Sequence, residues 1–147
     1  MTRSIRLLSA LALFGGGYFA GTQGKTPAAS AAQGATSDRV FEMRTYTSHP
    51  NRNPDVLRRF RDHTTYLFEK NGMKNIAYFV PTDTPQSQNT LIYIIAHPSR
   101  EAAQASWARF RADSAWIRAR TASEANGPIV LRTQSVFMKA TDFSPIQ

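Results

Sequence analysis

The sequence predicts an α+β domain with the ferredoxin-like order strand, helix, strand, strand, helix, strand. Apolar residues alternate with a period of two in residues 40–47, recur at helical spacing in residues 54–70, and form an almost unbroken run in residues 90–96. This order gives a four-stranded antiparallel sheet with both helices on one face. The 147 residues suffice for one such domain, and 41% hydrophobic residues are too many for a chain that is disordered throughout.

Residues 40–47 form the first predicted strand and residues 54–70 the first predicted helix. Asn53 is a favoured N-cap residue, and Pro54 suits the first helical position because its missing N–H is not needed there. Gly72 follows the end of the helix, where glycine tolerates a left-handed backbone. The pattern places four residues on the buried stripe of this helix: Val56, Phe60, His63 and Leu67.

The second half of the domain repeats the alternation of strand and helix. Ser99 is a favoured cap for the second helix, and the segment 113–120 either continues that helix or starts a short second one. The run 90–96 is apolar at nearly every position, which is typical of a strand buried on both faces. The remaining elements are a strand at 75–80, a polar loop at 81–89, a break at 126–128 and a final strand at 129–140.

The first 37 residues are predicted to be an export leader and linker. Arg3 and Arg6 precede a short apolar run, Leu7–Phe14, and small residues follow it. The run is shorter than the ~20 apolar residues of a spanning helix, so a retained membrane anchor is the second choice. Residues 25–37 are of low complexity and read as a flexible linker. We therefore expect residues 38–147 to form the domain of a periplasmic or secreted protein, which contacts a membrane only if the leader is retained as an anchor.

The composition excludes several classes of site. The chain has no cysteine, which rules out disulfides, thiolate metal centres and thiol nucleophiles. Its three histidines show no metal-ligand spacing, so we expect no metal site and no cofactor, although one histidine suffices for a haem and His63 or His97 would then be the ligand. The net charge is +8, but lysines and arginines do not cluster in the sequence, and we expect no nucleic-acid partner.

The predicted topology leaves one face of the sheet without a covering layer. We expect that face to carry Tyr78, Tyr93 and Met138, and an apolar face of this size is unfavourable in water. Two such sheets that face each other would cover it and enclose a cavity. The topology therefore predicts a homodimer.

The segment from Phe41 to Val80 resembles the NIPSNAP family. The motifs that carry the resemblance are Glu42-x-Arg44-x-Tyr46, Arg61-x-His63, Phe68-Glu69-Lys70-x-Gly72-Met73 and, further on, Arg109-Phe110-x-x-Asp113-x-Ala115-Trp116. The resemblance extends over about residues 40–140 and implies a dimeric α/β barrel of two ferredoxin-like units. That superfamily includes cofactor-independent oxygenases, haem-degrading enzymes, chlorite dismutases and proteins without known catalysis, so the fold does not select an activity. The export-type leader differs from the mitochondrial link of eukaryotic members, whose roles we do not carry over.

The sharpest set of candidate site residues is Glu42, Arg44 and Tyr46. Their spacing of two puts them on one face of the strand, and because Phe41 and Met43 form a natural helix-packed face, we expect the three to face the dimer cavity. Arg44 could hold a ligand carboxylate there, or it could form an internal ion pair with Glu42. We also expect Arg132 and Gln134 to lie on one face of the last strand and to join Arg44. The full set of cavity candidates is Glu42, Arg44, Tyr46, His63, Tyr78, Tyr93, Trp116 and Arg132.

These observations favour an exported homodimer that binds a small molecule in its cavity, and they assign no catalytic residue. One alternative is a cofactor-independent oxygenase or isomerase that uses Tyr46, His63 or Arg44 on an enolisable substrate, which requires a base within hydrogen-bond reach. Another is a non-catalytic interaction module whose barrel is filled. The sequence leaves open which ligand is bound and whether the protein is an enzyme.

Overall fold

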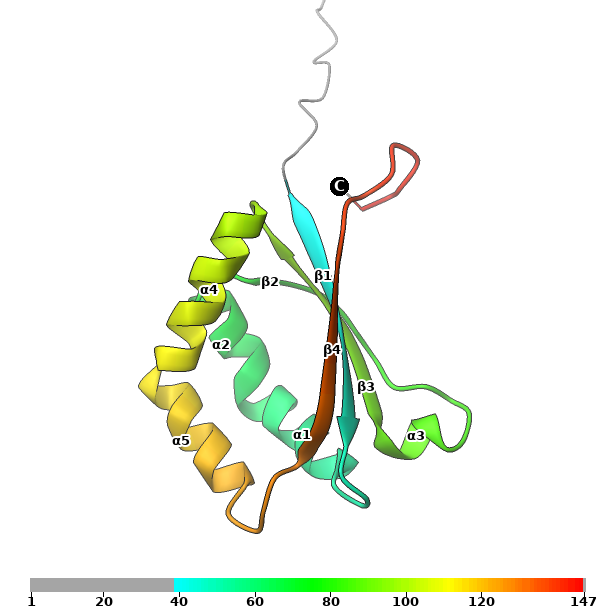
Figure 1. Ribbon diagram of the computed structural model, residues 1–147, viewed down its shortest axis with the longest axis vertical. Coiled ribbons are helices and arrows are strands. Elements are labelled where there is room, and N and C mark those ends of the chain that lie inside the picture. The colour runs from blue at the N-terminus through cyan, green and yellow to red at the C-terminus, as the bar shows by residue number, and fades with distance from the viewer. Residues whose placement is uncertain (1–38, 147) are drawn as a thin grey trace, which may run out of the picture. The chain divides into compact units, whose positions relative to one another are not determined.

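The computed structural model describes residues 39–146, and its centre is a single antiparallel sheet (Figure 1). The predicted leader, the linker and the domain boundary at residue 38 lie outside the described residues. The strands stand in the order β2-β3-β1-β4, which confirms the ferredoxin-like fold. Their bounds are β1 (Val40–Ser48), β2 (Lys74–Phe79), β3 (Thr90–His97) and β4 (Val130–Met138).

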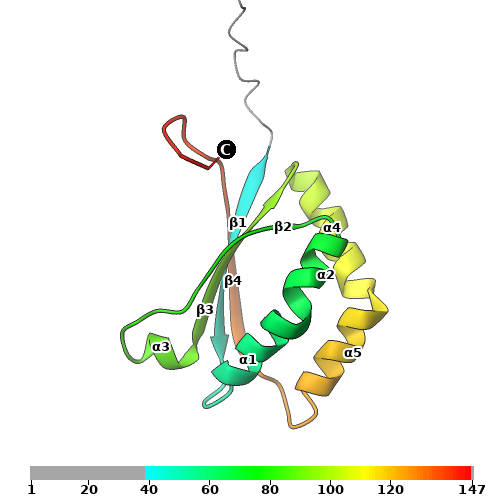
Figure 2. The ribbon, with the colours of Figure 1, turned by 180° about the vertical axis from the view of Figure 1, so that it is seen from behind.

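The helices cover one face of this sheet and leave the other face bare (Figures 1 and 2). The short helix α3 (Gln86–Asn89), which the sequence did not predict, lies in the β2–β3 connection and projects on the side away from the other helices. The covering layer consists of α1 (Asn53–Arg59), the π-helical turn η1 (Phe60–Thr64), α2 (Thr65–Lys70), α4 (Arg100–Ala112) and α5 (Ser114–Ser123).

The first helix departs from its predicted pattern in two places. It begins one residue early, so Arg52 is the N-cap and the prediction of Asn53 in that role is wrong. In η1, the Thr65 N–H binds the carbonyl of Phe60, five residues earlier. This wider turn moves the next inward position to Thr64, which is buried, and turns His63 out to solvent. The placement of His63 on the apolar stripe is therefore wrong.

Asp113 separates α4 from α5. Ser99 caps α4 as predicted, since its hydroxyl accepts the Ala102 N–H at 3.2 Å. Asp113 has extended backbone angles, and its carboxylate accepts the Ala115 N–H at 2.8 Å to start a second helix. Its ion pair with Lys70, helped by the bonds from Ala115 and Asn71, lowers the pKa of Asp113 to about 2. The carboxylate thereby joins the end of α2 to the α4–α5 junction.

The core lies between the sheet and the helices, and aromatic rings dominate it. Phe60, Phe68 and Tyr93 pack together with ring centroids 5.0–6.0 Å apart. Tyr78 stacks on Tyr93 at 5.7 Å, so both tyrosines lie on the covered face, and their predicted place on the bare face is wrong. Burial raises the pKa of both hydroxyls, which are therefore neutral at physiological pH.

The bare face of the sheet is also apolar. The register pairs Met43 with Ile94 on one side and with Val136 on the other, and Phe41 with Met138. Val136 and Phe79 are about half exposed, at 50% and 53%. We call this surface the open face. Met138 lies on it as predicted.

None of the helices described in residues 39–146 has the length and apolar content that crossing a membrane requires.

The turn after α2 leaves little room for a side chain at Gly72. Gly72 has φ +84°, and a Cβ there would lie 2.9 Å from Arg109 Nη2, which binds the Asn71 carbonyl. We expect Gly72→Ala to lower the free energy of unfolding by about 2 kcal/mol, from backbone strain and the displaced arginine. Gly127→Ala is the matched control, because Gly127 has φ +96° with open space around it. This substitution should lower the free energy of unfolding by about 1 kcal/mol, from backbone strain alone. Urea unfolding measures both values, and equal losses would contradict the close contact.

Candidate functional site

A cavity of about 310 Å³ lies between the α4–α5 pair and the part of the sheet formed by β1 and β4. Four aromatic side chains line it: Tyr46, Trp107, Phe110 and Trp116. Four arginines line it as well: Arg44, Arg59, Arg111 and Arg120. The lining is completed by Glu124, Pro128, Val130 and Thr133. The cavity thus combines flat apolar walls with an excess of positive charge.

The carboxylate of Glu42 lies behind this cavity and is 1% exposed. Its Oε1 accepts hydrogen bonds from Arg44 Nη1 at 2.8 Å and from Ser135 Oγ at 2.6 Å. Its Oε2 accepts one from Trp107 Nε1 at 2.7 Å and lies 3.2 Å from His97 Nε2. One buried charge therefore joins three strands and α4.

These bonds determine the charge state of Glu42. Burial alone would raise the pKa of its carboxyl, but the hydrogen bonds from His97, Ser135 and Trp107 and the charge of Arg44 outweigh it and lower the pKa to about 2. Burial acts against the charge of Arg44, while Tyr93, Tyr46 and Glu42 raise its pKa. Both members of the pair are ionised at neutral pH.

Arg44 connects the buried network to the cavity. Its guanidinium carbon lies 4.3 Å from the ring centre of Trp107 and 5.8 Å from that of Tyr46. Such stacking stabilises a guanidinium and fixes its plane. The internal ion pair with Glu42, which the sequence left open, is present, and Arg44 nevertheless lines the cavity.

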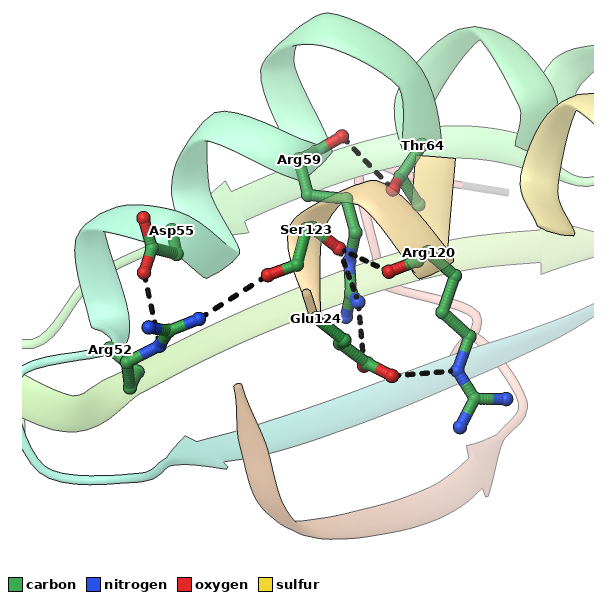
Figure 3. Close-up of polar contacts among 7 residues, drawn as sticks. All are labelled: Arg52, Asp55, Arg59, Thr64, Arg120, Ser123 and Glu124. Carbon is green, nitrogen blue, oxygen red and sulfur yellow. Dashed lines mark hydrogen bonds and ion pairs between the residues drawn. The ribbon is translucent and has the colours of Figure 1, made fainter. Parts of the chain in front are cut away.

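Figure 3 shows a second ionic cluster, in which Arg59, Arg120 and Glu124 are also lining residues of the cavity. Glu124, just after α5, accepts hydrogen bonds from Arg59 Nη1 at 2.9 Å and from Arg120 Nε at 3.1 Å. Arg59 also donates to Ser123 Oγ at 3.2 Å, and its guanidinium carbon lies 5.1 Å from the ring centre of Trp116. These contacts hold the end of α5 against α1.

The structure brings Glu42, Arg44 and Tyr46 to one face, but to the face opposite the predicted one. All three point toward the helices, where Trp107 of α4 meets Glu42 and Phe60 meets Tyr46. The prediction took the apolar residues of β1 to mark the covered face. That inference is wrong because both faces of this sheet are apolar, and Phe41 and Met43 belong to the open face.

The other predicted residues lie elsewhere. Arg132 pairs with Thr47, and Gln134 with Thr45, which puts both on the open face and away from Arg44. His63 lines a separate depression of about 180 Å³ beside α1 and α5. Tyr78 and Tyr93 belong to the core behind the cavity and do not line it. Of the eight candidates, Arg44, Tyr46 and Trp116 line the cavity, and Glu42 holds Arg44 and Trp107 in place.

The cavity does not suit a histidine-ligated haem. None of the histidines lines it, and His97 is buried with its Nε2 directed at Glu42. Within residues 39–146, no three histidine or acidic side chains are grouped in a way that could hold a metal ion.

Several cavity residues were not found from the sequence. Arg59 does not belong to the buried stripe predicted for this helix, but it is buried, at the point where the π turn begins. Arg111 and Arg120 lie on helix surfaces in a pattern that is indistinguishable from ordinary solvated charge. Trp107 lies 65 residues from Glu42, and its hydrogen bond to that carboxylate has no local signal in the sequence. The contacts of Glu42 with His97, Trp107 and Ser135 join residues far apart in the sequence and could not be found without the fold.

The sequence matches the NIPSNAP family profile over residues 41–145. The chain belongs to the NIPSNAP family. Solved structures of other members agree with this fold. A NIPSNAP-like domain protein from Burkholderia xenovorans is 19% identical with a TM-score of 0.64, covering 74% of this chain and 90% of its own. A NIPSNAP protein of unknown function from Agrobacterium tumefaciens is 20% identical with a TM-score of 0.63, covering 74% and 94%.

More distant comparisons add no activity to this NIPSNAP domain. The cofactor-independent oxygenase SnoaB from Streptomyces nogalater is 15% identical with a TM-score of 0.49. No curated protein matches the sequence.

The Glu42 network predicts a specific acid sensitivity. The folded-state pKa is about 2 and the ordinary value is 4.5, so the ionised carboxylate stabilises the fold at higher pH. This contribution, about 3 kcal/mol, is present above about pH 4.5 and is lost as the pH falls toward 2. We expect Glu42→Gln to lower the free energy of unfolding by about 3 kcal/mol at pH 7. The difference in this free energy between variant and wild type should narrow as the pH falls from about 4.5 to about 2. Urea unfolding at several pH values measures it.

Asp62→Asn is the control for this titration. Asp62 is exposed and forms no ion pair among the residues that the structure describes. Its variant should follow the wild-type pH dependence. A Glu42→Gln variant whose deficit stays constant from pH 7 to pH 2 would contradict the assigned charge state.

Proposed function

We propose that this NIPSNAP protein binds a small molecule in the cavity between its helices and its sheet, as an exported homodimer. The observation that carries the proposal is the lining of the cavity, which includes Trp116 together with Arg44 and Trp107, both hydrogen-bonded to the buried Glu42 carboxylate. Ligand sites are commonly concave, largely apolar and supplied with a few fixed polar groups. A volume of about 310 Å³ is at the lower end of such sites.

The fixed orientation of the polar groups supports ligand binding. Glu42 holds Trp107 and Arg44 through one hydrogen bond each, and both side chains reach the cavity from a network that is already complete. Groups that are oriented before the ligand arrives lose little freedom on binding. A cavity that is open and lined in this way favours binding over the interaction module with a filled interior.

The same network makes acid–base catalysis the second choice. An oxygenase or isomerase would need a base that can accept a proton from the substrate. Glu42 is occupied by four partners, and its lowered pKa makes it a weak base. Glu124 is engaged by two arginines. Tyr46 and Arg44, two groups that we considered for such a reaction, both line the cavity, but its lining holds no histidine, and its one carboxylate is the paired Glu124.

The open face supports the homodimer. Met43, Ile94 and Met138 contribute to an apolar surface with a groove of about 270 Å³, and Val136 beside Met43 is half exposed. A second copy of the same surface is complementary in character and would remove it from water. The basic and apolar N-terminal segment supports export.

Filling the cavity tests the ligand site. Thr133 lines it from the edge strand β4 and is exposed, so a larger side chain there does not disturb the core. We expect Thr133→Phe to weaken binding of a co-purified or screened small molecule at least tenfold, with unchanged thermal unfolding. Thr133→Val is the matched control of equal volume and should bind as wild type does. Native mass spectrometry of the purified protein detects the bound mass, and an unchanged affinity in Thr133→Phe would contradict the site.

A charge on the open face tests the dimer. We expect Met43→Lys to convert the protein to a monomer, because two lysines would be buried at the interface. Ile117→Lys is the control, since Ile117 is 51% exposed on α5 and should tolerate the charge. Sedimentation analysis measures the mass of each variant. A dimer that survives Met43→Lys would place the interface elsewhere.

A further inference from the structure

The charges around the cavity do not balance. Four arginine side chains line it, and Glu124 is the one carboxylate among its lining residues. Glu124 is shared between Arg59 and Arg120, and Glu42, behind the wall, neutralises Arg44. Even with Glu42 counted, cations outnumber carboxylates four to two.

Arg111 is the cation that lacks a counter-charge. It lies in the last turn of α4 and lines the cavity. Within residues 39–146 it forms no ion pair, and its neighbour Arg109 instead binds the Asn71 carbonyl. Arg120 has only a share of Glu124. Positive charge is therefore available at the α4–α5 side of the cavity.

The walls of the cavity strengthen this charge and add a shape preference. Aromatic walls have a lower dielectric constant than water, so charged groups beside them interact more strongly than in bulk solvent. The guanidinium of Arg44 stacks on the ring of Trp107, and that of Arg59 stacks on the ring of Trp116. These planar groups are part of the cavity lining. The lining suits a flat apolar body that bears negative charge.

We propose that the ligand is a small organic anion with a planar aromatic or conjugated body. Its charged group binds Arg111 and Arg120, and its body packs against Tyr46 and Trp116. This inference rests on the proposed small-molecule function and adds the ligand class. A cationic ligand would face four guanidinium groups, and an inorganic anion would leave the aromatic walls without a contact.

Three probes with one carbon skeleton separate charge from shape. We would titrate the full-chain protein with cinnamate, cinnamamide and cinnamylammonium by isothermal titration calorimetry at low ionic strength. We expect cinnamate to bind at least tenfold more tightly than the neutral amide, the ammonium compound not to bind, and salt to weaken the preference. Inorganic phosphate should compete weakly.

A matched pair of variants locates the charge. Arg111→Gln removes a cation that has no partner to strand, and we expect it to reduce the preference for cinnamate over cinnamamide about fivefold, with the affinity for the amide unchanged. Arg118→Gln removes the same charge from the exposed side of α5, away from the cavity lining, and should leave the preference intact. Circular dichroism checks that both variants are folded.

The outcomes separate this inference from the function on which it rests. Binding of the amide as tight as that of cinnamate would overturn the anionic class and leave the small-molecule function standing. Displacement of cinnamate by phosphate at equal concentration would overturn the aromatic requirement. Failure of all three probes to bind at millimolar concentration would count against the ligand class and the proposed function together. Equal effects of Arg111→Gln and Arg118→Gln would overturn the assigned location.

Discussion

The buried carboxylate of Glu42 is the constraint around which the structure is organised. A charge without water must be compensated by hydrogen bonds, and here the donors come from three strands and one helix. Satisfying Glu42 therefore fixes the position of α4 over the sheet through Trp107. It also fixes Arg44, whose stacking on the same tryptophan sets the wall of the cavity. The stability of the fold and the geometry of the site therefore both depend on the Glu42 carboxylate.

The sequence was sufficient for the order and type of the main elements, because alternation and helical spacing are local signals. The turn at Gly72 and the cap at Ser99 followed from single-residue conformational preferences. The π turn did not, since a helical wheel assumes 3.6 residues per turn and one extra residue rotates everything after it. That rotation explains why His63 is exposed, where the predicted stripe would have buried it. Arg59 lies before the π turn, and its burial goes with its contacts to Ser123 and Glu124.

The candidate site was predictable in part. The period of two correctly grouped Glu42, Arg44 and Tyr46, but it could not say which face they occupy, because Tyr93 and Ile95 are as apolar as Ile92 and Ile94 on the other side of β3. The choice depends on partners far apart in the sequence, such as Trp107 and Ser135. Arg111 and Arg120 carry no local signal, since an arginine on a helix surface is ordinary.

The alternation of β1 has a consequence for how this chain can evolve. Even-numbered residues from Glu42 to Tyr46 serve the cavity, while odd-numbered ones from Phe41 to Thr45 form the open face. Substitutions can therefore change the covered face and the open face separately, one parity at a time. Insertion or deletion of a single residue would exchange the two sets, placing Met43 under the helices and a carboxylate on the open surface. The alternation therefore constrains the length of this strand more tightly than the identity of its open-face residues.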